Sequence, residues 1–143
     1  MKRALLTLGC LLVLSLPSAA AAKGGTHVSI RSWSVETTDG KHHNAKVNST
    51  FRACASNPVQ AIDARGKVTG AVSGKGFKEI WTVNGRADST FAVAWSKSGS
   101  FTDFFGIGAN SGGLTTGRWR LKIVQGGKKI GQSAIKIATK AGC

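Results

Sequence analysis

The stretch Gly117-Arg118-Trp119-Arg120-Leu121-Lys122-Ile123-Val124 decides the fold of this chain. Its cationic and apolar side chains alternate strictly from Arg118 to Ile123, and a period of two is typical of a strand with one face buried and the other in water. A second run of strand-forming residues follows at 129–139, and Gly126-Gly127 between the two runs can turn the chain. The sequence therefore predicts a β-hairpin.

The length of the turn sets the register of this hairpin. A two-residue turn at Gly126-Gly127 would put Ile135 and Ile137 on the basic, wet side of the sheet. A three-residue turn that also includes Lys128 pairs Trp119 with Ile135 and puts both isoleucines on the apolar side. Because a slip of one residue moves a whole set of side chains to the wrong face, we expect the second register and a three-residue turn with a left-handed glycine.

Residues 1–22 have the pattern of a signal peptide, which leaves a mature domain of residues 23–143. The pair Lys2-Arg3 gives a positive start, residues 4–16 form an apolar middle that is short for a membrane span, and an alanine-rich end follows. We expect an exported protein, secreted or periplasmic, with no transmembrane segment in the mature chain. Cys10 leaves lipid attachment as an alternative, although it lies inside the apolar run and not after the small residues.

The mature chain is strongly basic. Without the leader it has 18 basic and 6 acidic residues, a formal charge of +12. This excess favours anionic partners such as a cell-wall polymer, lipopolysaccharide, nucleic acid or an anionic membrane surface. The basic residues are scattered along the chain, so their role could also be solubility alone.

Two cysteines remain after the leader, Cys54 and Cys143. An even pair in an exported chain predicts a disulfide bond, and free or intermolecular thiols are the alternative. Cys54 is expected on the outer face of a strand or at its end, and Cys143 beyond the last strand, so the bond should be peripheral and should fix the tail to the domain.

The rest of the chain predicts one all-β domain. Short runs of β-branched and aromatic residues alternate with glycine, serine, asparagine and aspartate, and no window keeps a helical period. In 28–35 the apolar parity switches, which indicates a bulge or an edge strand that changes sheets. Residues 57–76 are hard to read and contain a doubtful strand at 68–72. The seven main strands are expected at 28–35, 47–54 (Val47, Phe51 and Ala53 inward), 77–83 (Phe77, Trp81 and Val83 inward), 91–95 (Phe91, Val93 and Trp95 inward), 101–107, 117–124 and 129–139.

The second half of the chain resembles a known kind of domain. The segment Trp81-Thr82-Val83-Asn84-Gly85, the basic hairpin strand and the final Ile135-Lys136-Ile137 are similar to the second half of bacterial extracellular immunoglobulin-like or fibronectin type III-like domains. The resemblance implies a single antiparallel β-sandwich, used for adhesion, spacing or ligand binding. It departs from true immunoglobulin domains in one respect: the strand at 117–124 lacks the cysteine that would bridge the two sheets.

No motif predicts catalysis, a metal site or a cofactor. His42 and His43 are adjacent on an extended segment and point to opposite sides, so we interpret them as exposed imidazoles in a polar turn. The glycine-rich segment 70–76 lacks the spacing and the hydroxyl residue of a phosphate loop, and no Gly-x-Ser-x-Gly elbow occurs.

The acids and the tryptophans each leave a functional role open as an alternative. The six acids are far apart in sequence, but a carboxylate pair could still assemble in space. Glu79 is its first candidate because its parity places it between Phe77 and Trp81; the simpler interpretation is a sheet edge or a pair with a lysine. The four tryptophans could stack on sugars, but core packing is the simpler role.

The sequence thus predicts a non-catalytic, exported β-sandwich that acts as a binding or structural module at a cell surface or in a periplasm. Its partner would be a surface protein or an anionic polymer. The alternative is a basic polyanion-binding protein that uses Arg118, Arg120, Lys122 and Lys136. A small hydrolase with an unseen site is the second alternative.

Overall fold

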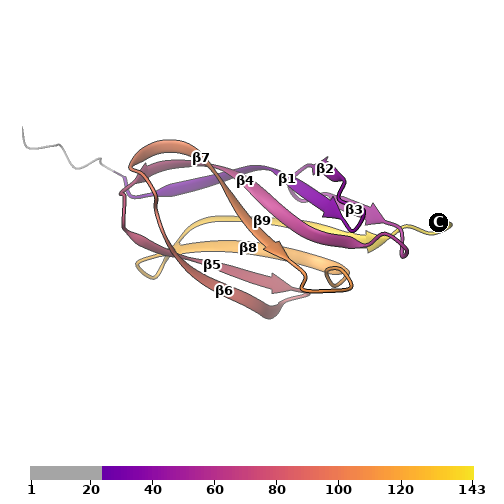
Figure 1. Ribbon diagram of the computed structural model, residues 1–143. Coiled ribbons are helices and arrows are strands. Elements are labelled where there is room, and N and C mark those ends of the chain that lie inside the picture. The colour runs from indigo at the N-terminus through magenta and orange to yellow at the C-terminus, as the bar shows by residue number, and fades with distance from the viewer. Residues whose placement is uncertain (1–23) are drawn as a thin grey trace, which may run out of the picture.

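The computed structural model describes residues 24–143, so the leader prediction for residues 1–22, including Cys10, lies outside the described residues. Within that range the chain is all-β and forms nine strands, two more than the sequence predicted (Figure 1). In this part of the chain no helix is long and apolar enough to cross a membrane. The strands are β1 His27–Thr37, β2 His42–Ala45, β3 Thr50–Ala53, β4 Val59–Ala71, β5 Gly76–Val83, β6 Arg86–Ala94, β7 Gly99–Gly108, β8 Gly117–Gln125 and β9 Lys128–Thr139.

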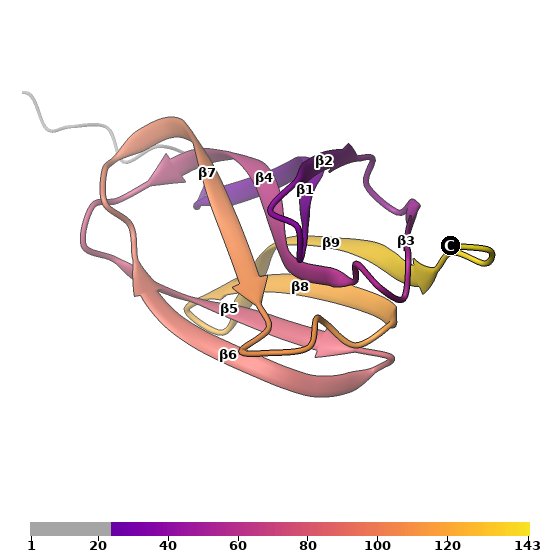
Figure 2. The same ribbon diagram turned by 45° about the vertical axis from the view of Figure 1, so that its right-hand side comes forward.

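The strands form two sheets that enclose one core (Figure 2). A four-stranded sheet has the order β2-β1-β4-β7, and a five-stranded sheet has the order β3-β9-β8-β5-β6. Every pairing is antiparallel except that of β3 with β9, which is parallel. The prediction of a purely antiparallel sandwich is therefore wrong at this pair.

All four tryptophans lie in the core, with exposed fractions of 2 % or less. The rings of Trp33 and Trp81 meet edge to face with centroids 6.0 Å apart, and Phe77 stacks on Trp95. Such contacts add to the burial of large aromatic surfaces. Core packing is thus the role of the tryptophans, and none of them is available to stack on a sugar.

The hairpin of β8 and β9 has the predicted register but not the predicted turn. Trp119 lies opposite Ile135, as the burial argument required. The turn has two residues, Gly126 and Gly127, both with positive φ (57° and 75°), which is the backbone of a type I′ hairpin turn. The parity change comes instead from a bulge between Ile123 and Val124, where Ile130 of the facing strand is left unpaired.

The predicted switch of parity in β1 is also a bulge. Ile30 pairs with Gly66, whereas Ser32 pairs with Arg65, so Arg31 is the extra residue. The strand stays in the four-stranded sheet on both sides of the bulge, so the alternative of a strand that changes sheets is wrong.

The largest error concerns β4, a central strand of 13 residues where the sequence indicated only a doubtful strand at 68–72. Its inward positions include the small residues Ala64 and Gly66, which conceal the alternation. Gly66 is closely packed: a Cβ atom there would meet Ile30 Cδ1 and Val28 Cγ1 at 3.0 Å, so these side chains would have to shift.

Two predictions for residues 42–54 need correction. The expected polar turn at His42-His43 is strand β2, and His43 is half-buried against Phe51, with ring centroids 5.2 Å apart. The strand expected at 47–54 is shorter, because β3 begins at Thr50 and leaves Val47 in the preceding turn with 37 % of its surface exposed.

Phe91, Val93 and Trp95 were expected to form a buried inner row, but only Trp95 is buried. Phe91 is 42 % and Val93 is 39 % exposed. Their parity was read correctly, since they lie opposite Glu79 and Phe77 of β5. However, β6 is the edge strand of the wider sheet, so its inward side chains are covered only in part.

The predicted disulfide between Cys54 and Cys143 is present. It joins the end of β3 to the tail that follows β9, close to the backbone bond from Lys140 N–H to the Ala53 carbonyl (2.8 Å). The bond is peripheral, as predicted, and reinforces the short parallel pairing of β3 with β9.

Candidate anion-binding face

The outer surface of the five-stranded sheet carries the four basic residues that the sequence singled out. The side chains of Trp119, Leu121 and Ile123 point into the core and are at most 1 % exposed, so alternation turns the intervening cations outward. Lys136 lies directly opposite Arg118. The structure therefore brings together, on one face, the exposed side chains of Arg118, Arg120, Lys122 and Lys136.

Two neighbouring strands extend this surface with cations that sequence reasoning missed. Lys78 of β5 and Arg52 of β3 are exposed, and each alternates with inward residues of its strand. Their strands flank β8 and β9. We call the set Arg52, Lys78, Arg118, Arg120, Lys122 and Lys136 the basic face.

Asn84 holds the beginning of β8, where the first cation of this strand lies. Its backbone N–H donates to the Arg118 carbonyl oxygen at 3.0 Å, and its side-chain oxygen accepts the Arg118 backbone N–H at 2.9 Å. Asn84 also has a left-handed φ of 50° in the β5–β6 turn, a conformation that asparagine tolerates. The turn that ends β5 thus holds the first cation of β8 in place.

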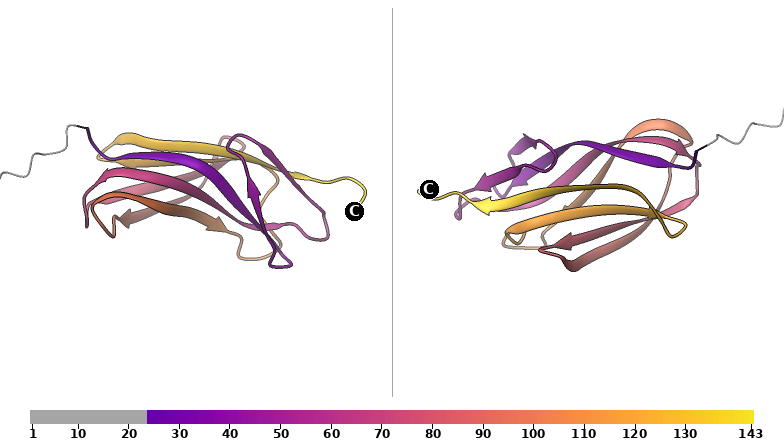
Figure 3. Two further views of the ribbon diagram at one scale, coloured as in Figure 1. Left: turned by 90° about the horizontal axis from the view of Figure 1, so that it is seen from above. Right: turned by 180° about the vertical axis from the view of Figure 1, so that it is seen from behind.

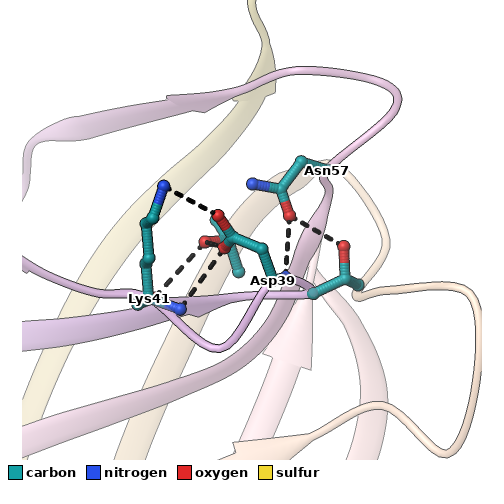
Figure 4. A network of polar contacts seen from close by, with 5 residues as sticks. Asp39, Lys41 and Asn57 are labelled. Atoms are coloured by element: carbon teal, nitrogen blue, oxygen red, sulfur yellow. Dashed lines mark hydrogen bonds and ion pairs between the residues drawn. The ribbon is translucent and has the colours of Figure 1, made fainter.

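The strands that carry the basic face hold no outward acid: β3, β8 and β9 contain none, and Glu79 of β5 is turned inward. Glu36 and Asp63 alternate with buried residues of β1 and β4, so they point outward from the four-stranded sheet. The only ion pair in the described part of the chain joins Lys41 to Asp39 at 3.3 Å, in the β1–β2 turn (Figure 4). The cations of the basic face are therefore not neutralised by ion pairs.

The turn that holds Asp39 is a local structural device. The hydroxyl of Thr37 donates to Asp39 at 2.6 Å, and Asn57 accepts the backbone N–H of Asp39 at 3.0 Å. Figure 4 shows this network. Hydrogen bonding with the side chains of Thr37 and Asn57 holds the pKa of Asp39 well below its ordinary value, so this carboxylate stays ionised within the turn.

A hollow of about 770 Å³ lies over part of the basic face and continues past β9. Basic, aliphatic and polar side chains all line it. Its lining includes Arg118, Arg120, Lys122 and Lys129, the apolar Ile30, Val47 and Ile80, and the polar Asn48, Thr82 and Gln132.

Glu79 is buried, with 8 % of its surface exposed. It lies neither at a sheet edge nor beside a lysine, contrary to the simpler expectation, and its Oε2 accepts a hydrogen bond from the Trp81 indole N–H at 3.3 Å. Burial raises the pKa of Glu79, and the charge of Asp103 on β7 adds to the rise, against the opposing effect of the indole. Neither carboxylate lines any of the hollows described for residues 24–143.

This buried carboxyl makes stability depend on pH. A raised pKa means that the folded state binds the proton more tightly than the unfolded state. Its stabilising effect is therefore present below the ordinary glutamate pKa of 4.5 and is lost as pH rises through the raised value. We expect Glu79→Gln to flatten the decline in unfolding free energy as pH rises above the ordinary glutamate pKa of 4.5. Urea unfolding at several pH values measures this, and parallel curves for the two proteins would contradict it.

The histidines do not converge on a metal site. His42 and His43 point to opposite sides of β2, and His27 begins β1. In the described part of the chain no group of three or more His, Cys, Asp or Glu side chains is placed to hold a metal ion.

Comparison with known proteins defines the class of fold. No family model matches the chain, and no curated protein matches it. A crystal structure of an immunoglobulin-like protein from Pseudomonas aeruginosa is similar, with a TM-score of 0.50 and 13 % identity over 81 % of this chain and 98 % of that one. At this identity the likeness shows the fold alone: the domain is an immunoglobulin-like β-sandwich. The likeness does not extend to the fibronectin type III class in particular.

Proposed function

We propose that this domain is a non-catalytic binding module and that its ligand is an anionic polymer held on the basic face. The observation that carries the proposal is the difference in charge between the two outer surfaces. Six exposed cations share the outer surface of the five-stranded sheet, whereas the four-stranded sheet mixes Arg31, Arg65 and Lys67 with the acids Glu36 and Asp63. A charge that served solubility alone would not need this difference.

The geometry of the basic face suits a polymer better than a small anion. Alternate residues of a strand are about 7 Å apart and neighbouring strands about 5 Å apart, so the cations are spread over an extended surface. An exposed ion pair at 4 Å contributes only about 1 kcal/mol in water. Useful affinity therefore requires several contacts with one ligand.

The disulfide supports an exported location, because such bonds persist in oxidising compartments. We propose that the protein acts outside the cytoplasm, where cell-surface polymers are the available anionic ligands.

Charge-removing variants test this proposal. We expect Arg118→Gln, Arg120→Gln and Lys122→Gln together to weaken binding to long-chain polyphosphate and to reduce the slope of log affinity against log salt by about three. Fluorescence anisotropy with a labelled polyphosphate, at several salt concentrations, gives both quantities.

The matched control removes the same residue types from the four-stranded sheet. Arg31, Arg65 and Lys67 are exposed and are replaced by glutamine, so both triple variants have the same net charge. An equal loss of affinity in the two variants would show that the protein is merely cationic and that the basic face is not a site.

A further inference from the structure

We infer that the natural ligand of the basic face is an anionic amphiphile, with its anionic group on the cations of β8 and an acyl-like chain that follows the edge of β9. This inference rests on the proposed function and names the ligand class of the same site. It is carried by the apolar continuation of the hollow that lies over the basic face.

The edge of β9 that faces β1 lacks a partner strand over its first part. β3 pairs with β9 only from Lys136 to Thr139, and the backbone N–H of Asn48 donates to the Ala134 carbonyl oxygen at 2.8 Å. Residues 128–133 therefore have no strand of their own sheet beside them on that side. Figure 3 shows β1, in indigo, running next to β9, in yellow, along this side of the sandwich. The two strands touch at Gly131, where a Cβ atom would meet Val28 Cβ and the Val28 carbonyl oxygen at 2.8 Å.

Two hollows follow this edge and share part of their lining. The hollow of about 770 Å³ reaches from the basic face to Ile30 and Val47. A second one, of about 310 Å³, continues along β1 and β9 to His27 and Ile130. Ile30, Lys129 and Gln132 line both, so the two form one continuous path beside β9.

The chemistry of the path changes along its length. At one end Arg118, Arg120 and Lys122 offer positive charge, and no acid lines either hollow within residues 24–143. Past β9 the lining includes the aliphatic side chains of Val47, which is 37 % exposed, and of Ile30 and Ile130, which are half-buried at the margin of the core. Polar groups of Asn48, Ser29 and His27 lie among them.

Lys129 lies where the two hollows meet. Its ammonium donates a hydrogen bond to the side-chain oxygen of Gln132 at 3.0 Å. A long basic side chain can cover an apolar surface with its methylene groups while its charge stays in water. Lys129 can therefore flank an apolar chain and contact the anionic group at the same time.

An amphiphile uses both parts of this path, whereas a bare polyanion uses one. A purely anionic polymer would pair with the cations but leave the aliphatic lining in water. An apolar chain attached to the anion would cover that lining, and the gain is proportional to the apolar area removed from water. Positive charge beside an aliphatic wall is the complement of an anion that carries a chain.

Dodecyl phosphate, used below its micellar concentration, is the probe for this inference, and binding is measured by isothermal titration calorimetry on the mature chain. We expect it to bind at least about tenfold more tightly than inorganic phosphate. Arg120→Gln should weaken it, and Val47→Ser should weaken it about threefold or more because part of the apolar wall is lost. Long-chain polyphosphate should bind the Val47→Ser variant as it binds the unchanged protein.

Val72→Ser is the matched control, because Val72 is also a valine outside the strands and is 55 % exposed, but it lines neither hollow. It should leave dodecyl phosphate binding unchanged. Equal effects of Val47→Ser and Val72→Ser would overturn the inference, as would equal affinity for dodecyl phosphate and inorganic phosphate, or for uncharged dodecyl maltoside. In each of these cases polyphosphate binding that depends on the basic face would leave the proposed function standing.

Discussion

Replacement of Trp119 with alanine is expected to lower the free energy of unfolding by about 3 to 5 kcal/mol, the cost typical of a large aromatic side chain lost from a core. Trp119 is 1 % exposed and lies between Ile135 of β9 and Val83 of β5. Its indole N–H also donates to the Thr115 carbonyl oxygen at 2.8 Å. The substitution therefore removes core volume and leaves the 109–116 loop without one of its anchors.

Phe91→Ala is the control for this prediction, because Phe91 is also an aromatic residue of the five-stranded sheet but is 42 % exposed. It should cost less than half as much as Trp119→Ala, since less apolar surface returns to water. Urea unfolding followed by circular dichroism measures both variants. A loss below about 1 kcal/mol for Trp119→Ala would contradict the assignment of this residue to the core.

Removal of the disulfide is the second large expected effect. With a sequence separation of 89 residues, the chain-entropy model gives up to roughly 4 to 5 kcal/mol for closing the loop in the unfolded state. We expect replacement of both Cys54 and Cys143 by serine to lower the unfolding free energy by a large part of this amount. β3 pairs with β9 over four residues only. In the double serine variant, amide hydrogen exchange should therefore become faster in β3 than in β4.

Reduction provides the control for the cysteine variant. A reducing agent should destabilise the unchanged protein to the level of the double serine variant and should leave that variant unaffected. If the oxidised protein and the double serine variant unfold at the same urea concentration, the bond does not stabilise the domain and the prediction is wrong.

The parts of the fold that local pattern encodes were predictable. Strict alternation in β8 and the need to bury Ile135 and Ile137 gave the register of the last hairpin, although a bulge at Ile130 produces it and not a longer turn. The parity of Glu79 gave its inward direction. The disulfide was predicted because two cysteines remain in a chain expected to be exported.

The remaining parts depend on which strands become neighbours. β4 was concealed because its inward position 66 is a glycine packed closely against Ile30 and Val28, where an apolar side chain would have marked the strand. Phe91 was predicted to be buried because alternation gives the direction of a side chain but not what covers it. The parallel pairing of β3 with β9 has no local signal at all.

The same distinction applies to the basic face. Arg118, Arg120 and Lys122 share one strand, and Lys136 joins them through the hairpin, so local pattern was sufficient to group them. Lys78 also alternates with buried residues, and that signal could have placed it on an outer surface. That Lys78 and Arg52 lie on the basic face follows from the strand order β3-β9-β8-β5, which the sequence alone did not show.

The location of the bound ligand tests the central claim most directly. In a titration of the isotopically labelled domain of residues 24–143 with long-chain polyphosphate, followed by two-dimensional amide NMR, the account predicts that the largest shifts cluster on β8, on the adjoining part of β9 and around Lys78 and Arg52. Amides of the four-stranded sheet near Arg65 and Lys67 should move little. Shifts of similar size on both sheets, or the largest ones around Arg65 and Lys67, would contradict the assignment of the basic face as the binding site.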